Sequence, residues 1–198
     1  MSSKSRMPAD TRTRILEAAL KRIDRSKGAD VAMAEIAEAA GVSRQALYLH
    51  FADRTELLIA VAHHVDARRG LGAKLQAISD ASDGVAAMLA MVALQAEDNP
   101  SLWPIARTFE AVRRTDRAAE KAWQDRLNNR LAMCRSIVAR MHTDGSLRQG
   151  LDADTAADVL WTLTSLRMWE DLVVQRGWSG ERYRTQVGAL LLGALCCQ

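Results

Sequence analysis

The placement of proline is the feature of this sequence that most restricts its fold. The chain of 198 residues has three prolines, Pro8, Pro100 and Pro104, so the stretches 9–99 and 105–198 contain none. Alanine occurs 34 times and leucine 23 times, whereas valine, isoleucine and threonine together occur 29 times. Because alanine and leucine favour helices and β-branched residues favour strands, a β-sandwich or barrel is excluded. We predict an all-α protein of about nine helices.

Apolar residues at spacings of three and four, together with capping residues, predict where these helices lie. We expect Gly28 to stop the first helix, and Asp53 with Glu56 to form a capping box at the start of the fourth. Pro100 is expected to open a separate helix, with Pro104 tolerated in its first turn. The expected spans are 10–27, 34–40, 44–49, 53–69, 83–97, from 99 onward, 116–141, 152–175 and 181–195.

Charge separates the chain into two parts near Gly70. Residues 1–70 carry 12 basic and 9 acidic side chains, whereas residues 71–198 carry 15 of each. The basic excess precedes a helical module, which favours an anionic polymer as partner, although a solubilising tail is the alternative on charge alone. We therefore predict a domain boundary near Gly70, between an N-terminal part over 1–70 and a C-terminal part over 71–198.

The sequence also indicates where in the cell the protein is expected. The N-terminal residues are polar and basic, and the longest strongly apolar run, residues 187–197, is too short to span a membrane. Three cysteines, two of them adjacent, indicate reduced thiols rather than a disulfide framework. We expect a cytoplasmic protein with no membrane partner.

The segment AEIAEAAGVSRQALYLHF, residues 34–51, has the pattern of a helix-turn-helix. Gly41 supplies the positive φ of a tight turn, and Ser43 is placed to cap the second helix. Arg44 and Gln45 then stand in the first turn, where a helix in the major groove meets base edges. Arginine pairs with guanine and glutamine with adenine, and Ala46 would touch a thymine methyl group.

Flanking residues make this pattern specific. The run from RIL at 14–16 through EIA at 35–37, AGVS at 40–43, Tyr48 and HF at 50–51 to EL at 56–57 resembles the N-terminal domain of TetR-family transcriptional regulators. The resemblance covers about residues 12–60. It implies an N-terminal DNA-binding domain over 1–70, with a helix-turn-helix at about 32–51 and a linking helix. It also implies a C-terminal domain over 71–198 that senses a small molecule and forms a homodimer. The DNA-binding residues that it and the helix geometry indicate are Ser43, Arg44, Gln45, Ala46, Tyr48, His50 and Arg54.

Two departures from the family pattern concern DNA contact. Many relatives have glycine or alanine where Gln45 stands, so we expect an additional base contact there. The usual threonine or serine cap of the preceding helix is replaced by the run VAM at residues 31–33. A hydroxyl contact to phosphate is therefore expected to be absent.

Large apolar side chains gather in the C-terminal part, where all five tryptophans lie. They either line an apolar cavity or fill an ordinary core. The candidate pocket residues are Met88, Met91, Trp103, Phe109, Trp123 and Trp169. A surplus of apolar faces on the last two helices predicts a dimer interface, with Leu163, Leu166, Val187, Leu190 and Leu191 as candidates.

No set of residues for catalysis, cofactor binding or metal binding stands out. His63 and His64 are adjacent, so on a helix they point about 100° apart and chelate one ion poorly. We predict a non-enzyme, without cofactor or metal, that represses transcription from a palindromic operator and is released by a small apolar or aromatic ligand. The alternatives are a transcriptional activator and a ligand-binding or interaction module without DNA binding.

Overall fold

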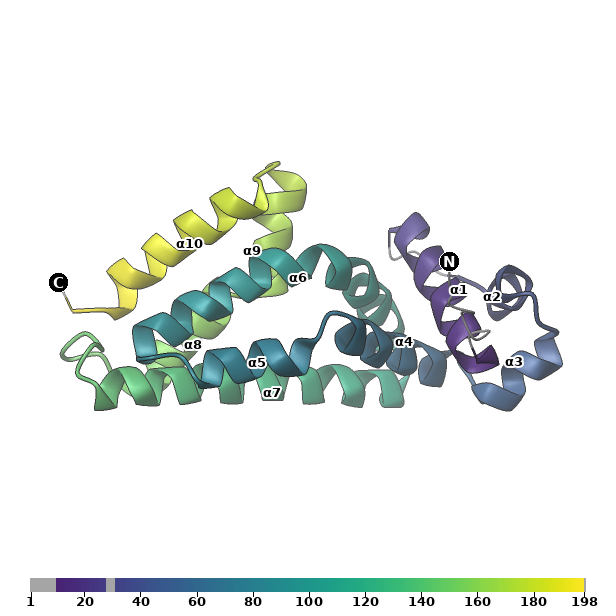
Figure 1. Ribbon diagram of the computed structural model, residues 1–198, viewed down its shortest axis with the longest axis horizontal. Coiled ribbons are helices and arrows are strands. Elements are labelled where there is room, and N and C mark those ends of the chain that lie inside the picture. The colour runs from purple at the N-terminus through teal and green to yellow at the C-terminus, as the bar shows by residue number, and fades with distance from the viewer. Residues whose placement is uncertain (1–9, 28–30, 198) are drawn as a thin grey trace, which may run out of the picture. The chain divides into compact units, whose positions relative to one another are not determined.

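A computed structural model describes residues 10–27 and 31–197 (Figure 1). These residues form helices and no β-strand, with one isolated bridge between Leu147 and Cys196, which confirms the all-α prediction. Within this described part, no helix is both long and apolar enough to cross a membrane. By internal contacts the chain divides into a head unit, residues 1–65 with 104–120, and a body unit, residues 66–103 with 121–198. The functional boundary at Gly70 stays a prediction.

The head unit begins with helices close to the expected spans. They are α1 (Thr11–Ser26), α2 (Met33–Ala40), α3 (Arg44–His50) and α4 (Arg54–Arg68). Lys27, at φ 51°, ends α1 in the left-handed region; the predicted stop at Gly28 and the basic residues 1–9 lie outside the described residues. Ile15, Leu47 and Phe51 are fully buried and form part of this unit's core.

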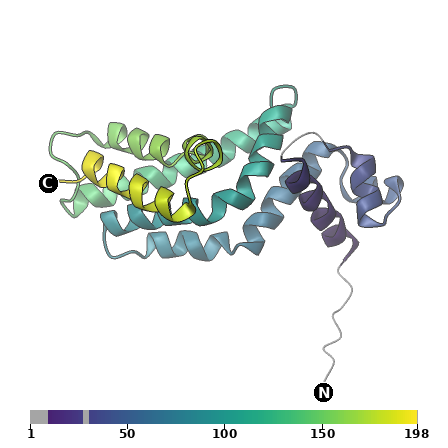
Figure 2. The ribbon, with the colours of Figure 1, turned by 90° about the horizontal axis from the view of Figure 1, so that it is seen from above.

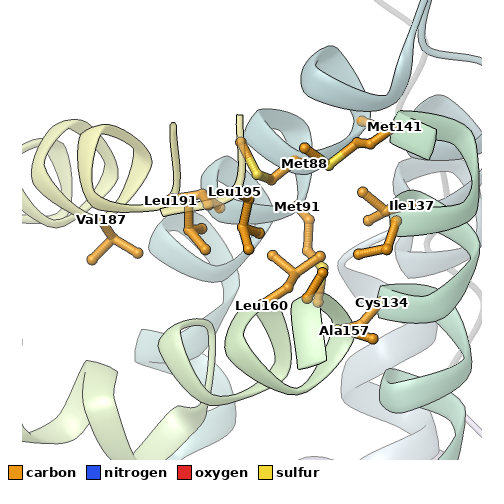
Figure 3. Packing of buried hydrophobic residues seen from close by; sticks show 14 of the residues in the cluster. Met88, Met91, Cys134, Ile137, Met141, Ala157, Leu160, Val187, Leu191 and Leu195 are labelled. Carbon is orange, nitrogen blue, oxygen red and sulfur yellow. The ribbon is translucent and has the colours of Figure 1, made fainter. Parts of the chain in front are cut away.

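The body unit is a bundle of longer helices, seen from two sides in Figures 1 and 2. Its elements are α5 (Leu71–Ser79), the first part of α6 (Gly84–Val112), most of α7 (Arg117–Thr143), α8 (Ala153–Leu163), α9 (Leu166–Trp169), the π-helix η1 (Glu170–Gln175) and α10 (Gly180–Leu195). Side chains from α6, α7, α8 and α10 interdigitate at its centre (Figure 3). Met88, Ile137, Leu160 and Leu191 are among the most completely buried residues there.

The prediction of two helices over 83–97 and from Pro100 onward is wrong, because α6 runs continuously through both prolines. Each proline removes the amide donor for the carbonyl four residues earlier, that of Ala96 or Pro100, and α6 continues through the remaining backbone bonds of its turns, with side-chain hydrogen bonds close by. Arg69 donates from Nη1 to the carbonyl oxygen of Asp98 at 2.8 Å, and Thr108 donates to that of Pro104 at 3.0 Å. Burial on several sides also holds the helix together across this region.

The single helix expected over 152–175 is also wrong. The first helix, α8, ends at Leu163, and the hydroxyl of Thr164 donates to the Leu160 carbonyl at 2.6 Å. Ser165 then begins α9 by accepting a hydrogen bond from the Met168 amide at 3.1 Å. The sequence signal for this break is the Thr-Ser pair, since serine favours a helix N-cap over a helix interior. The separate helix α5 was not expected either.

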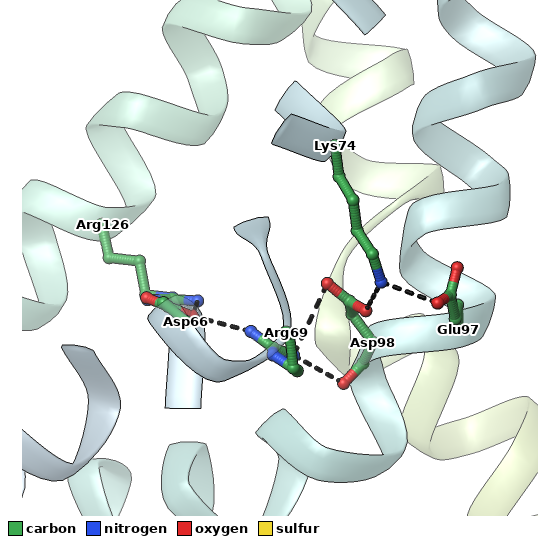
Figure 4. Close-up of polar contacts among 6 residues, drawn as sticks. All are labelled: Asp66, Arg69, Lys74, Glu97, Asp98 and Arg126. Carbon is green, nitrogen blue, oxygen red and sulfur yellow. Dashed lines mark hydrogen bonds and ion pairs between the residues drawn. The ribbon is translucent and has the colours of Figure 1, made fainter. Parts of the chain in front are cut away.

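A network of charged side chains joins helices in the body unit (Figure 4). Asp66 accepts from Arg126 at 2.7 and 3.1 Å and from Arg69 at 2.7 Å. Lys74 donates to Glu97 and to Asp98, at 2.7 Å each. Burial acts to raise the pKa of Asp66, but the two arginines outweigh it and lower that pKa below its usual value. The last turn of α4 is thereby tied to α7, and α5 to α6.

Candidate nucleic-acid interface and body site

The turn between α2 and α3 has the geometry that the sequence predicts. Gly41 has a φ of +65°, and its amide donates to the Glu38 carbonyl at 3.0 Å. The amide of Val42 donates to the Ala37 carbonyl at 3.0 Å. At the start of α3, the Ser43 hydroxyl accepts from the Ala46 amide at 3.0 Å. The N-cap of α2 is Ala32, without a side-chain cap, as expected from the departure at residues 31–33.

Polar side chains cover the outer face of α3, while its inner face is buried. Arg44 and Gln45 are exposed in the first turn, and Ala46 is half-buried. Tyr48 is 51% exposed, whereas Leu47 is completely buried. The seven predicted DNA-binding residues therefore lie on α3, its cap and the first residue of α4, with His50 and Arg54 half-buried.

Leu49 belongs to the same surface, although the sequence analysis did not select it. Its side chain is 82% exposed, the largest value among the exposed large hydrophobic residues. A leucine normally gains free energy by burial, so an exposed leucine on a short surface helix is a candidate contact. The signal in the sequence was its position, two residues after the buried Leu47.

The start of α4 is held by local and distant hydrogen bonds. Asp53 accepts from the Glu56 amide at 2.8 Å, and the Glu56 carboxylate accepts from the Ala52 amide at 2.7 Å. The expected capping box is thus present, with the return bond one residue earlier. Thr55, which is buried, donates to Asp116 at 2.6 Å. That hydrogen bond is the main reason why the pKa of Asp116 is lowered.

Neither histidine of the adjacent pair takes part in a metal-like cluster. His64 lies 2.7 Å, Nε2 to Oε1, from Glu17 of α1, while His63 is exposed. Within residues 10–27 and 31–197, no three His, Cys, Asp or Glu side chains gather closely enough to hold a metal ion. His64 therefore links α4 to α1 within the head unit.

The six candidate pocket residues do not form one group. Met88, Met91 and Trp169 lie in the body core, and Trp103 packs against it. Phe109 belongs to the head unit, and Trp123 is half-buried on α7. None of the six lines the apolar groove of about 480 Å³ between α6 and α10, whose walls are Leu89, Ala90, Ala93, Arg184, Thr185, Gly188, Ala189 and Leu192.

The body core contains polar atoms that are buried without a hydrogen-bond partner. They are the side-chain amide of Asn99, the indole nitrogens of Trp161 and Trp169, and the hydroxyl of Tyr183. Native cores leave few such groups unpaired, so each of them marks a place where a polar ligand or water can bind. Asn99 and Tyr183 were not predicted from the sequence, because neither belongs to the pattern of large apolar residues from which the candidate pocket residues were chosen.

The candidate dimer residues differ in exposure. Leu190 is 52% exposed, and Leu163 and Leu166 are half-buried. Val187 and Leu191 are completely buried in the core of their own chain. Of the five residues, Leu163, Leu166 and Leu190 have exposed surface that a second copy of the chain can contact.

These features define a helix-turn-helix unit and a helical body unit. Residues 15–61 match the family model described as bacterial regulatory proteins, tetR family. The predicted resemblance to TetR-family transcriptional regulators is therefore confirmed over these residues.

Comparison with solved structures supports the same fold over nearly the whole chain. A transcriptional regulator of Saccharomonospora viridis is 18% identical, with a TM-score of 0.81 over 96% of this chain and 100% of that one. NalD of Pseudomonas aeruginosa is 20% identical, with a TM-score of 0.68 over 94% and 96%. FadR of Bacillus subtilis is 17% identical, with a TM-score of 0.72 over 91% and 97%. At these identities the likeness shows the fold. No curated protein matches the chain significantly.

Proposed function

We propose that the protein is a homodimeric repressor that binds a palindromic operator and leaves it when a small apolar or aromatic ligand binds the body. The observation that carries this proposal is the exposed first turn of α3, with Arg44 and Gln45 on a helix capped by Ser43. Its role is binding rather than catalysis. Since chromosomal DNA is the target, we expect the protein in the bacterial cytoplasm.

Several features support base contact by α3. Arg44 can bridge O6 and N7 of guanine, and Gln45 can pair with N6 and N7 of adenine, each worth about 1–3 kcal/mol of discrimination. Tyr48, His50 and Arg54 lie further along the same surface, where contacts to phosphate fix the register of the helix. One short helix reads few bases, so two copies about 34–36 Å apart are needed for a specific site.

Ligand control is supported by the unpartnered polar atoms of the body core and by related folds. Similar structures include the regulator of S. viridis in complex with choline, FadR in complex with stearoyl-CoA, and a SmeT–triclosan complex. A ligand of this chain must bind the DNA-free form better than the DNA-bound form, since equal affinity shifts no population.

The test is fluorescence anisotropy with a labelled duplex that carries an inverted repeat from DNA upstream of the protein's own gene. We expect tight binding that weakens steeply with salt, and a Kd at least tenfold higher in the Arg44→Ala, Gln45→Ala double variant. Arg167→Ala is the matched control, because that side chain is 86% exposed and lies on α9. Undiminished sequence preference in the double variant would contradict the assigned contacts.

A further inference from the structure

Arg130 of α7 is a partly buried cation without a counter-charge. Its Nη1 donates to the carbonyl oxygen of Trp161 at 2.6 Å and to the Thr164 hydroxyl at 3.2 Å. Its guanidinium carbon lies 4.5 Å from the centroid of the Trp161 ring. Among residues 10–27 and 31–197, no carboxylate forms an ion pair with it. Burial accordingly lowers the pKa of Arg130.

The two acidic groups beside Arg130 cannot serve as its anion. Burial raises the pKa of the Cys134 thiol to about 11, even though Arg130 acts in the opposite direction. Burial likewise raises the pKa of Tyr183 to about 12 against the influence of Arg130. Both groups are therefore neutral at physiological pH. A partly buried cation without an anionic partner has lost part of its hydration, so the site favours a ligand that brings the missing charge.

Two polar groups near Arg130 have a donor without a hydrogen-bond partner. The Tyr183 hydroxyl and the Trp161 indole N–H are buried and have no hydrogen-bond partner. Tyr183 is completely buried, and its neighbours in the core include Leu160 and Val187. One cation, two free donors and an apolar surround complement an anionic group attached to an apolar molecule.

We propose that Arg130, Tyr183 and Trp161 bind the carboxylate of an otherwise apolar ligand in the body unit. A single negative charge balances Arg130, whereas a phosphate monoester, with a charge near −2, would leave buried negative charge uncompensated. A cationic ligand such as choline would face Arg130 without compensation. The inference deepens the proposed ligand control, on which it rests, by naming the ligand's chemical class.

The experiment measures binding by isothermal titration calorimetry to the full-length protein in the absence of DNA. The probes are octanoate and 4-phenylbutyrate, each beside its matched primary alcohol, with choline as a cationic probe. We expect at least one carboxylate to bind tenfold or more tightly than its alcohol. In Arg130→Met this preference should fall to about one, and in Tyr183→Phe it should fall severalfold. Arg135→Met, on the same helix with a side chain 60% exposed, should keep it.

The outcomes separate this inference from the proposed function. Equal binding of acid and alcohol to the unaltered protein, tighter binding of choline, or a preserved preference in Arg130→Met would overturn the inference. Tyr183→Phe removes a single oxygen, so it tests the site even if Arg130→Met fails to fold. Specific DNA binding without carboxylate binding would support the proposed repressor function and refute the inference. Carboxylate binding without specific DNA binding would support the inference and refute the proposed repressor function.

Discussion

Individual side chains on and around α3 decide whether the helix forms and what it presents. Ser43 satisfies the Ala46 amide, one of the backbone donors that a helix start leaves without an intrahelical partner. Leu47 points inward and is completely buried, whereas Leu49 points outward and is 82% exposed. A seven-residue helix is too short to be stable alone, so the cap and the buried leucine both matter.

Ser43→Ala should therefore destabilise the protein. Loss of an N-cap hydroxyl costs about 1 kcal/mol. Urea unfolding followed by circular dichroism at 222 nm measures the change in the free energy of unfolding. Ser136→Ala, at an exposed position within α7, is the control and should be neutral or slightly stabilising. Equal effects of the two substitutions would show that the cap contributes nothing.

Leu49 should affect DNA binding rather than stability. Because the side chain is exposed, Leu49→Gln should change the free energy of unfolding by less than about 0.5 kcal/mol. If leucine touches a thymine methyl group, the variant should bind the operator severalfold more weakly and show altered preference at a thymine position. Anisotropy with a panel of singly substituted duplexes checks this, and an unchanged profile across the panel would exclude the contact.

At the level of helices, two kinds of contact hold the body unit together. One is the charge network that ties the end of α4 to α7 and α5 to α6 (Figure 4). The other is close backbone packing, where the first residue of α6, Gly84, lies against Met141 of α7. Gly84 also donates its amide to Asp144 at 2.7 Å.

Asp66→Asn should destabilise the body by about 2–3 kcal/mol at neutral pH, because Arg69 and Arg126 lose their shared anion. The pKa of Asp66 is lower in the folded than in the unfolded state. Its stabilisation is therefore present above about pH 4 and is lost as pH falls through the lowered pKa. Urea unfolding at pH 7 and near pH 3 measures the free energy of unfolding of the variant and of the unaltered protein. The difference between the two should be smaller near pH 3 than at pH 7. Asp125→Asn, at a surface pair with Lys121, should change stability by less than about 0.5 kcal/mol.

Two glycine substitutions should change the stability of the protein in opposite directions. A Cβ added at Gly84 would lie 2.5 Å from the Met141 amide nitrogen, so Gly84→Ala should cost about 1–3 kcal/mol. A Cβ added at Gly72, within α5, meets nothing within 4 Å. Gly72→Ala should therefore stabilise the protein by about 0.5–1 kcal/mol through helix propensity. Thermal unfolding of both variants tests the packing, and a stabilising Gly84→Ala would refute it.

At the level of the whole molecule, the proposed repressor needs two copies. The surface that the body can offer a partner includes Leu190, which is 52% exposed, and the half-buried Leu163 and Leu166. An exposed leucine on a long terminal helix is consistent with an interface between copies.

Leu190→Glu should convert the dimer to a monomer with an unchanged circular dichroism spectrum. Size-exclusion chromatography with light scattering measures the mass. Operator affinity should fall in parallel, because one half-site gives little binding energy. Leu49→Glu, an exposed leucine on α3, should keep the dimer mass while weakening DNA binding. A Leu190→Glu variant that stays dimeric would contradict the expectation that α10 forms part of the interface.

The sequence by itself determined the features whose partners lie within about four residues. The turn at Gly41, the cap at Ser43, the box at Asp53 and Glu56, and the outward face of α3 all follow from local hydrogen bonds and helical periodicity. These features also carry the family pattern, so the exposed surface of α3 could be predicted from the sequence.

Only the tertiary structure decided features whose partners are distant in the chain. Arg69 donates to a carbonyl in α6 from 29 residues away, in the stretch where α6 continues past Pro100 and Pro104. Thr55 meets Asp116 across 61 residues, and Arg130 meets Trp161 across 31. Local propensity contains no information about such partners, because long-range packing selects them after the helices have formed. The proposed body site therefore depends on the fold, whereas α3 could be predicted from the sequence.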